Sequence, residues 1–206
     1  MVKSMKTYNY KYYFWGPYFF HIKIDPKDIK LLKKLCHRKK ERLTRHTLAG
    51  DIKDEYGLEH RKVQTILQEY LKVYQEGYCQ WYNSKIKPEI KTKSAWVNYM
   101  KAGDYNPVHV HQDCDLSSVI YLDIPDLLKK EIKQYEGTTK GPGCISFYYG
   151  EIAPYTISNL EFTPEIGDMF IFPYSLRHCV NPYKSKCERV SVAVNYVITN
   201  RELFSK

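Results

Sequence analysis

The segment from Asn106 to Asp115 gathers residues that bind metal ions in proteins. It reads Asn-Pro-Val-His-Val-His-Gln-Asp-Cys-Asp, so His111 and Asp113 are two positions apart. On an extended strand, side chains at this spacing point to the same side, and both can reach one ion. His178, which follows the segment 167–173, is the candidate for a third ligand. Two imidazoles and one carboxylate form the ligand set of many non-haem Fe(II) sites, which keep coordination positions open. We therefore expect His111, Asp113 and His178 to hold a catalytic metal ion.

A second pair of residues indicates an anion site. Arg189 and Ser191 follow His178 on the next expected strand, and their spacing puts them on one face of it. A guanidinium group beside a hydroxyl can fix a carboxylate through a paired contact and one further hydrogen bond. A dicarboxylate that chelates the metal through its 2-oxo acid end would present its far carboxylate to this pair.

The elements that must position these residues change character along the chain. The first half is basic and helical: Asp25-Pro26 is a helix start signal, and apolar residues recur at helical spacing over 59–74. From Ser94 onward, short β-rich runs alternate with glycine and proline. We expect strands in runs 95–101, 108–112, 117–124, 144–149, 155–162, 169–172 and 189–198, with a polar and helical insertion at 126–135. The aromatic run 12–20 is expected to be a buried strand.

This order of elements predicts an α+β fold that is mainly β, a sandwich or jelly roll with helical support. The chain has 206 residues, of which 43% are apolar, enough for one good core. We expect one domain, in which residues 1–93 supply an N-terminal strand and helical support. Residues 94–206 are expected to form the catalytic core.

The motifs also resemble a known family. Over about 94–196, the order of the motifs resembles that of the 2OG-Fe(II) oxygenases of phages and marine bacteria, which are distant relatives of the prolyl hydroxylases. The motifs are, in order, W-x-N-Y, G-D-Y-N, H-x-H-x-D, L-S-S-V-I-Y-L, G-D, F-P, R-H-C-V-N-P and R-x-S. The resemblance implies a double-stranded β-helix and a dioxygenase that uses Fe(II), 2-oxoglutarate and O2. It also implies iron ligands at His111, Asp113 and His178, with 2-oxoglutarate held by Arg189 and Ser191. Further contacts to the co-substrate are expected from Asn98, Tyr99 or Tyr121.

The same segment leaves an alternative ligand set open. The spacing Gly103-x5-His109-x-His111 also resembles the first cupin motif, in which both histidines are ligands. The glutamate of that motif is missing, and Asp113 or Asp115 stands in its place. The two interpretations share the jelly roll and His178, and they differ in whether His109 or Asp113 completes the site. The pair Arg189 and Ser191 favours the oxygenase.

The composition limits the partners. The net charge of +9 favours anionic partners, although a lysine-rich solvated surface explains it equally well. No C-x-x-C pair occurs among the six cysteines, and no secretory segment opens the sequence, so reduced thiols and a cytoplasmic location are expected (host cytoplasm for a viral protein). No stretch is long enough to predict a membrane span. The oligomeric state is left open.

The expected reaction is hydroxylation of a peptidyl side chain, with proline as the first choice by analogy with the prolyl hydroxylases. A nucleic-acid substrate is the second choice, because the chain is basic. A cupin-like protein that binds metal without using 2-oxoglutarate is the alternative from a different class.

Overall fold

The computed structural model describes residues 16–44, 47–151 and 153–201. The elements along the chain are β1 (Phe20–Lys23), α1 (Pro26–Leu35), the short 3-10 helix η1 (Lys40–Arg42), β2 (Asp54–Gly57), α2 (His60–Tyr82), β3 (Ile90–Lys101), β4 (Asn106–His109), β5 (Leu116–Asp123), α3 (Asp126–Lys133), β6 (Ile145–Tyr148), β7 (Asn159–Phe162), β8 (Asp168–Pro173), β9 (Arg177–Val180) and β10 (Glu188–Ile198). The expected mainly β fold with helical support is confirmed.

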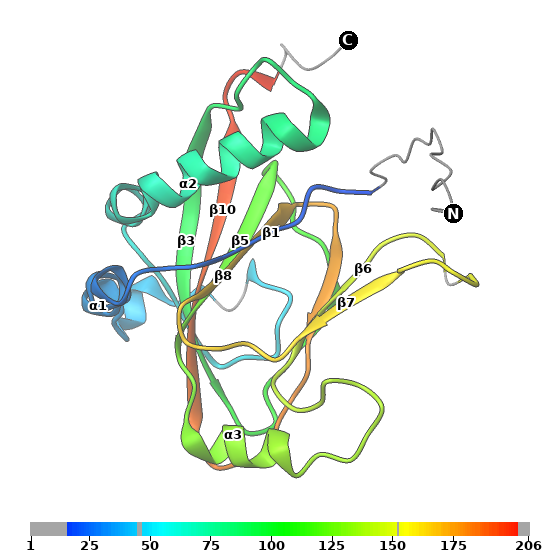
Figure 1. Cartoon of the computed structure of the whole chain (residues 1–206). Coiled ribbons are helices and arrows are strands. Elements are labelled where there is room, and N and C mark those ends of the chain that lie inside the picture. Colours follow the sequence, from blue (N-terminus) through cyan, green and yellow to red (C-terminus); the bar gives the residue numbers. More distant parts are fainter. Residues whose placement is uncertain (1–15, 45–46, 152, 202–206) are drawn as a thin grey trace, which may run out of the picture.

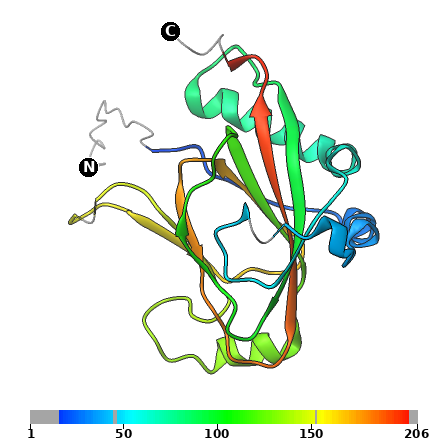
Figure 2. The same ribbon diagram turned by 180° about the vertical axis from the view of Figure 1, so that it is seen from behind.

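Two antiparallel sheets face each other. The larger sheet has the strand order β1-β8-β5-β10-β3-β2, and the smaller sheet has the order β4-β9-β6-β7. Figures 1 and 2 show α1 and α2 on the outer side of the larger sheet, and α3 at one end of the molecule. This is the jelly-roll arrangement that the motifs imply: from β3 to β10 the chain passes repeatedly between the two sheets, and only β6 and β7 follow each other within one sheet.

Alternation along β10 divides its residues between two environments. Val190, Val192, Val194 and Tyr196 pack in the core that the helices cover. The residues between them, at positions 189, 191, 193 and 195, line the space between the sheets. Successive side chains of a strand point to opposite faces, so a single strand supplies both the hydrophobic core and the polar interior.

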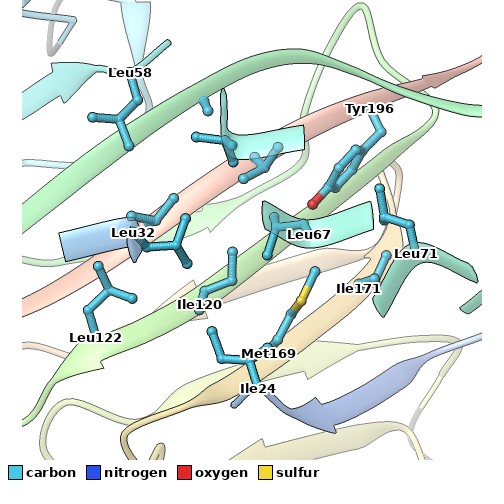
Figure 3. Packing of buried hydrophobic residues seen from close by; sticks show 14 of the residues in the cluster. Ile24, Leu32, Leu58, Leu67, Leu71, Ile120, Leu122, Met169, Ile171 and Tyr196 are labelled. Atoms are coloured by element: carbon cyan, nitrogen blue, oxygen red, sulfur yellow. The ribbon is translucent and has the colours of Figure 1, made fainter. Parts of the chain in front are cut away.

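The core beneath the helices is closely packed. Figure 3 shows Leu32, Leu67 and Ile120 from α1, α2 and β5 meeting side by side, and each is fully buried. Truncating one such side chain to alanine typically costs 2–5 kcal/mol of unfolding free energy. The helices therefore hold the larger sheet firmly in place beneath the interior that carries the chemistry.

The helices are as expected in position and differ in extent. Asp25 caps α1 by accepting a hydrogen bond of 2.8 Å from the backbone N–H of Lys27. Helix α2 continues to Tyr82, eight residues beyond the expected end. Gly77 lies within the helix and does not end it. A Cβ at this position would clash with the Tyr18 hydroxyl oxygen. The glycine makes room for Tyr18 rather than for a turn.

The strand prediction was incomplete. Strands β1, β2 and β9 were not expected, and they are four residues long each. In the run 12–20, residues 12–15 lie outside the described part, and the strand that follows begins only at Phe20. Within the described part, no helix has the length and apolar character that crossing a bilayer requires.

Candidate metal centre and its cavity

Three histidines converge between the two sheets. His109 ends β4 and pairs with His178 on β9, while the backbone N–H of His111 donates to the Tyr174 carbonyl at 2.9 Å. One potential ligand atom from each of the three imidazoles lies within 4.8 Å of the others. The Nε2 atoms of His111 and His178 are 3.3 Å apart. Two nitrogens bound at right angles to one metal ion, with bonds of about 2.1 Å, would be about 3 Å apart, so the pair is close to metal-binding geometry.

The backbone fixes the tautomer of two of these imidazoles. The Nδ1–H of His178 donates to the Leu176 carbonyl at 2.9 Å, and that of His109 donates to the Pro107 carbonyl at 2.7 Å. Both Nε2 atoms are therefore left with a lone pair for a metal ion. A backbone carbonyl that orients the ring in this way is a common feature of histidine metal ligands.

Burial keeps the three rings neutral. Burial first, and the nearby His109 second, lower the pKa of His178 to about 3 and that of His111 to about 4. Burial also lowers the pKa of His109. A metal ion binds only the neutral imidazole, so at neutral pH the three histidines need not lose a proton before they bind one.

Asp113 lies outside this group. It borders the same cavity, but among the described residues the group of close potential ligands consists of the three histidines. The expectation for Asp113 assumed a strand from 108 to 112, whereas β4 ends at His109. Asp113 then adopts a left-handed backbone conformation with a φ of 55°, and Lys93 donates to its carbonyl. The i, i+2 rule for strands therefore does not apply to His111 and Asp113.

The histidines stand in the wall of a cavity of about 600 Å³. Asn98, Tyr121, Arg189 and Ser191 also line it, as expected for residues that hold a co-substrate. Three of them lie side by side, because Ser191 of β10 pairs with Asn98 of β3 on one side and with Tyr121 of β5 on the other. The row of polar side chains therefore crosses the floor of the larger sheet.

Arg189 is a buried cation without a described carboxylate partner. It is 2% exposed, its Nη1–H donates to the Gly143 carbonyl at 2.7 Å, and its guanidinium carbon lies 5.2 Å from the centre of the Tyr121 ring. Among the described residues, the buried Nε of Arg189, the Tyr121 hydroxyl and the Asn98 side-chain oxygen have no hydrogen-bond partner. Buried polar atoms in proteins are almost always paired. A carboxylate ligand would satisfy the positive charge and the two donors, so these residues fit the far end of 2-oxoglutarate.

Tyr99 does not reach this cavity. It is adjacent to Asn98 on β3 and therefore faces the helices, where it packs in the core with the Arg38 guanidinium 3.8 Å above its ring. Other cavity residues were not foreseen: Glu55 on β2, Trp96 on β3 and Asn195 on β10. Asn195 shares the face of Arg189 and Ser191, so the period of the strand contained a signal for it. The sequence contained no such signal for Glu55, because it did not predict strand β2.

The comparisons with known proteins agree with this arrangement. Residues 94–195 match the family model described as "Putative 2OG-Fe(II) oxygenase". No curated protein matches the chain by sequence. Solved structures do match by fold. One is a viral collagen prolyl hydroxylase from Paramecium bursaria Chlorella virus 1, solved with 2OG, with a TM-score of 0.55 and 15% identity over 88% of this chain and 96% of that one.

Two further structures share the fold at similar distance. A prolyl-4-hydroxylase from Pseudomonas putida matches with a TM-score of 0.54 and 14% identity, over 87% of this chain and 91% of its own. A prolyl hydroxylase from Trichoplax adhaerens, in complex with a fragment of the oxygen degradation domain of hypoxia inducible factor, matches with a TM-score of 0.53 and 11% identity, over 91% and 87%. Residues 94–195 therefore form a 2OG-Fe(II) oxygenase domain, which makes this chain an enzyme that uses Fe(II) and 2-oxoglutarate.

Proposed function

We propose that this enzyme hydroxylates a peptidyl side chain, with a prolyl residue as the first candidate. The observation that carries the proposal is the cavity, which has three neutral imidazoles in its wall and, on the floor of the larger sheet, a buried Arg189 that forms no ion pair with a described carboxylate. The peptide is suggested by prolyl hydroxylases of the same fold, one of them in complex with a peptide fragment. Fold similarity alone is a weak argument for a substrate, so the substrate needs its own test.

For the metal, we propose that His111 and His178 supply two ligands and that His109 supplies the third. The support is the mutual distance of the three imidazoles and the backbone hydrogen bonds that turn Nε2 of His109 and His178 inward. The alternative third ligand is Asp113, which a rotation of the segment after His111 would have to bring closer. Bound iron and 2-oxoglutarate together supply the oxidising chemistry of this enzyme class.

The protein's own residues bind, orient and exclude water. Arg189 and Tyr121 would hold the distal carboxylate of 2-oxoglutarate, with Ser191 and Asn98 beside them. Ser117, whose hydroxyl lies 3.1 Å from Nε2 of His111, borders the metal site on the side of the larger sheet. Trp96 and Phe172 add apolar walls near His111, at ring distances of 6.3 Å each, and limit the access of water.

The test is anaerobic binding of Fe(II) and 2-oxoglutarate, followed by the visible charge-transfer band that the chelated pair gives. We expect the band in the wild type, its loss in His109→Ala and His111→Ala, its persistence in Asp113→Ala, and weaker 2-oxoglutarate binding in Arg189→Ala. Loss of the band in Asp113→Ala with retention in His109→Ala would assign the third ligand to Asp113 instead. No band in the wild type would refute the co-substrate assignment.

The substrate is tested separately, by incubating the iron-loaded enzyme with proline-containing peptides and measuring succinate and the gain of one oxygen atom by mass spectrometry. Oxygen incorporated at a residue other than proline would keep the peptide and change the side chain. Turnover with oligonucleotides and not with peptides would move the enzyme to the nucleic-acid class.

A further inference from the structure

The positive charge of this chain is concentrated in one segment. Residues 27–42 contain eight lysine or arginine residues and two acidic residues, a net charge of +6 out of +9 for the whole chain. Lys33 pairs with Asp123, and Arg38 pairs with Glu188 and Asp54. Six cations remain that are exposed and form no ion pair with a described carboxylate; we call them the basic strip: Lys27, Lys30, Lys34, Lys39, Lys40 and Arg42.

Helix α2 provides an internal comparison. Over His60–Tyr82 it carries three basic and two acidic residues, and each of its lysines pairs with a glutamate three positions earlier, Lys62 with Glu59 and Lys72 with Glu69. This is the usual pattern of a solvated helix face, with signs mixed and pairs three or four residues apart. The basic strip lacks that pattern. Its charges repel one another, and an anionic partner would relieve the repulsion.

The C-terminal end of the basic strip lies close in sequence to residues that line the cavity. Lys27, Lys30 and Lys34 lie on the face of α1 opposite to the buried Ile29 and Leu32. The chain continues through η1, and residues 47–49 then line the cavity. Thr47 is five positions after Arg42, so at full extension the two lie at most about 18 Å apart. Figure 2 shows the cyan segment that begins at residue 47 between the two sheets.

The absence of aromatic residues distinguishes between anionic partners. Between Phe20 and Tyr56 the sequence has no Phe, Trp or Tyr, although these make up 15% of the chain. Proteins that bind single-stranded nucleic acid place aromatic rings beside their cations, because the bases stack on them. The basic strip offers charges alone. Carboxylates of an extended acidic peptide need nothing more than exposed ammonium and guanidinium groups.

We propose that the basic strip binds an acidic stretch of the enzyme's polypeptide substrate, displaced from the residue that enters the cavity. The proposal rests on the peptidyl substrate of the proposed function and adds to it a charge requirement at a distance. At about 3.3 Å per extended residue, the limit of about 18 Å between Arg42 and Thr47 corresponds to about five residues, so we expect the acidic stretch to begin about five positions from the part of the substrate at the cavity.

The test uses the full iron-loaded protein and two fluorescein-labelled peptides. Each has one proline, and one peptide carries four glutamates that begin five residues away, where the other carries glutamines. A single-stranded oligo(dT) of equal charge is the third probe. Binding is measured by anisotropy at low and at physiological salt, and 2-oxoglutarate binding is measured on the same preparations. We expect the glutamate peptide to bind about tenfold more tightly than the glutamine peptide, with a preference that falls as salt rises.

Two matched triple variants decide the location. Lys39→Gln, Lys40→Gln and Arg42→Gln remove three charges from the end of the basic strip that precedes the cavity-lining segment, while Lys85→Gln, Lys91→Gln and Lys130→Gln remove the same charge from exposed positions elsewhere. The first variant should lose most of the preference for glutamate and keep its 2-oxoglutarate binding, and the second should retain both. Equal losses in the two variants, equal binding of the two peptides, or tighter binding of the oligonucleotide would each overturn the proposal. Failure of 2-oxoglutarate binding in the wild type would refute the proposed function instead.

Discussion

Replacing Tyr121 by phenylalanine should stabilise the apo protein and weaken 2-oxoglutarate binding at the same time. The side chain is fully buried, and its hydroxyl has no hydrogen-bond partner in the part of the chain that the structure describes. Burial raises the pKa of Tyr121 to about 12, so the hydroxyl stays protonated and can donate. Leaving a buried polar group unpaired costs about 1–3 kcal/mol, and the phenylalanine variant avoids that cost. We expect a gain of about 1 kcal/mol in unfolding free energy, which is about 2–4 °C in Tm for a domain of this size.

The same hydroxyl should matter when the ligand is bound. A hydrogen bond to a charged group contributes about 1.5–3 kcal/mol, so its loss should raise the Kd of 2-oxoglutarate about 10- to 100-fold. Thermal unfolding of the apo protein and anaerobic titration with Fe(II) and 2-oxoglutarate measure the two effects independently. If the variant is more stable and binds 2-oxoglutarate more weakly, the Tyr121 hydroxyl contributes to ligand binding and not to the stability of the fold.

Tyr196→Phe is the matched control. Tyr196 is also fully buried on a strand of the same sheet, but it packs in the helix-covered core, and its hydroxyl lies 2.9 Å from that of Ser118. Its loss should cost about 0.5–1.5 kcal/mol of stability and leave 2-oxoglutarate affinity unchanged. If Tyr121→Phe instead lost stability as the control does, with unchanged 2-oxoglutarate affinity, the reasoning from the unpaired hydroxyl would be refuted.

Four other outcomes follow from the structure. Burial lowers the pKa of His111 to about 4 and that of His178 to about 3, so below pH 6.5 the unfolded apo chain takes up protons that the folded chain excludes. The free energy of unfolding, measured from urea midpoints, should therefore fall by about 2 kcal/mol or more between pH 6.5 and pH 5. A stability that does not change with pH in this range would contradict the prediction. Gly77→Ala should cost about 1–3 kcal/mol through the clash with the Tyr18 hydroxyl, with partial recovery in a Tyr18→Phe background as the check in denaturant titrations. Arg189→Lys should keep the charge and still weaken 2-oxoglutarate binding, because one ammonium cannot replace the guanidinium; equal affinity in the titration would exclude a paired contact. Saturating Co(II) should raise the Tm of the wild type, and chelator should reverse it, whereas His111→Ala should show neither effect.

Regular periods explain which parts of the fold the sequence predicted. Alternation over 189–198 placed Arg189 and Ser191 on one face, and the structure has both in the cavity wall. The start of α1 was predicted because Asp25 and Pro26 act within one turn. The same period could have resolved Asn98 and Tyr99, since neighbours on a strand must face opposite sides. Only Asn98 reaches the cavity.

The missed parts depend on contacts between distant segments. Strand β2 has four residues and forms because β3 offers it an edge, from Asp54 opposite Tyr99 to Gly57 opposite Trp96. Its own residues give too little pattern for prediction, so Glu55 and the preceding loop were not connected with the cavity. In the same way, the end of β4 at His109 is set by its pairing with β9, where His109 lies opposite His178. The spacing of the histidines along the chain does not predict the residue at which that pairing ends.

The end of β4 therefore has a chemical consequence. With His111 and Asp113 on a common strand, the metal site would hold one anionic ligand, and the bound ion would keep a formal charge of 1+. With His109, His111 and His178, all neutral because of burial, the ion would keep its full 2+ charge. A dianionic 2-oxoglutarate would then neutralise the metal site, and the buried Arg189 would add one further positive charge at its far end. Charges interact strongly in a buried site, so the three-histidine set should make metal and 2-oxoglutarate binding more strongly interdependent than the set with a carboxylate. Measuring 2-oxoglutarate affinity with and without metal, in the wild type and in His109→Asp, would test this coupling directly, because the variant introduces a carboxylate in place of the imidazole that we propose as the third ligand.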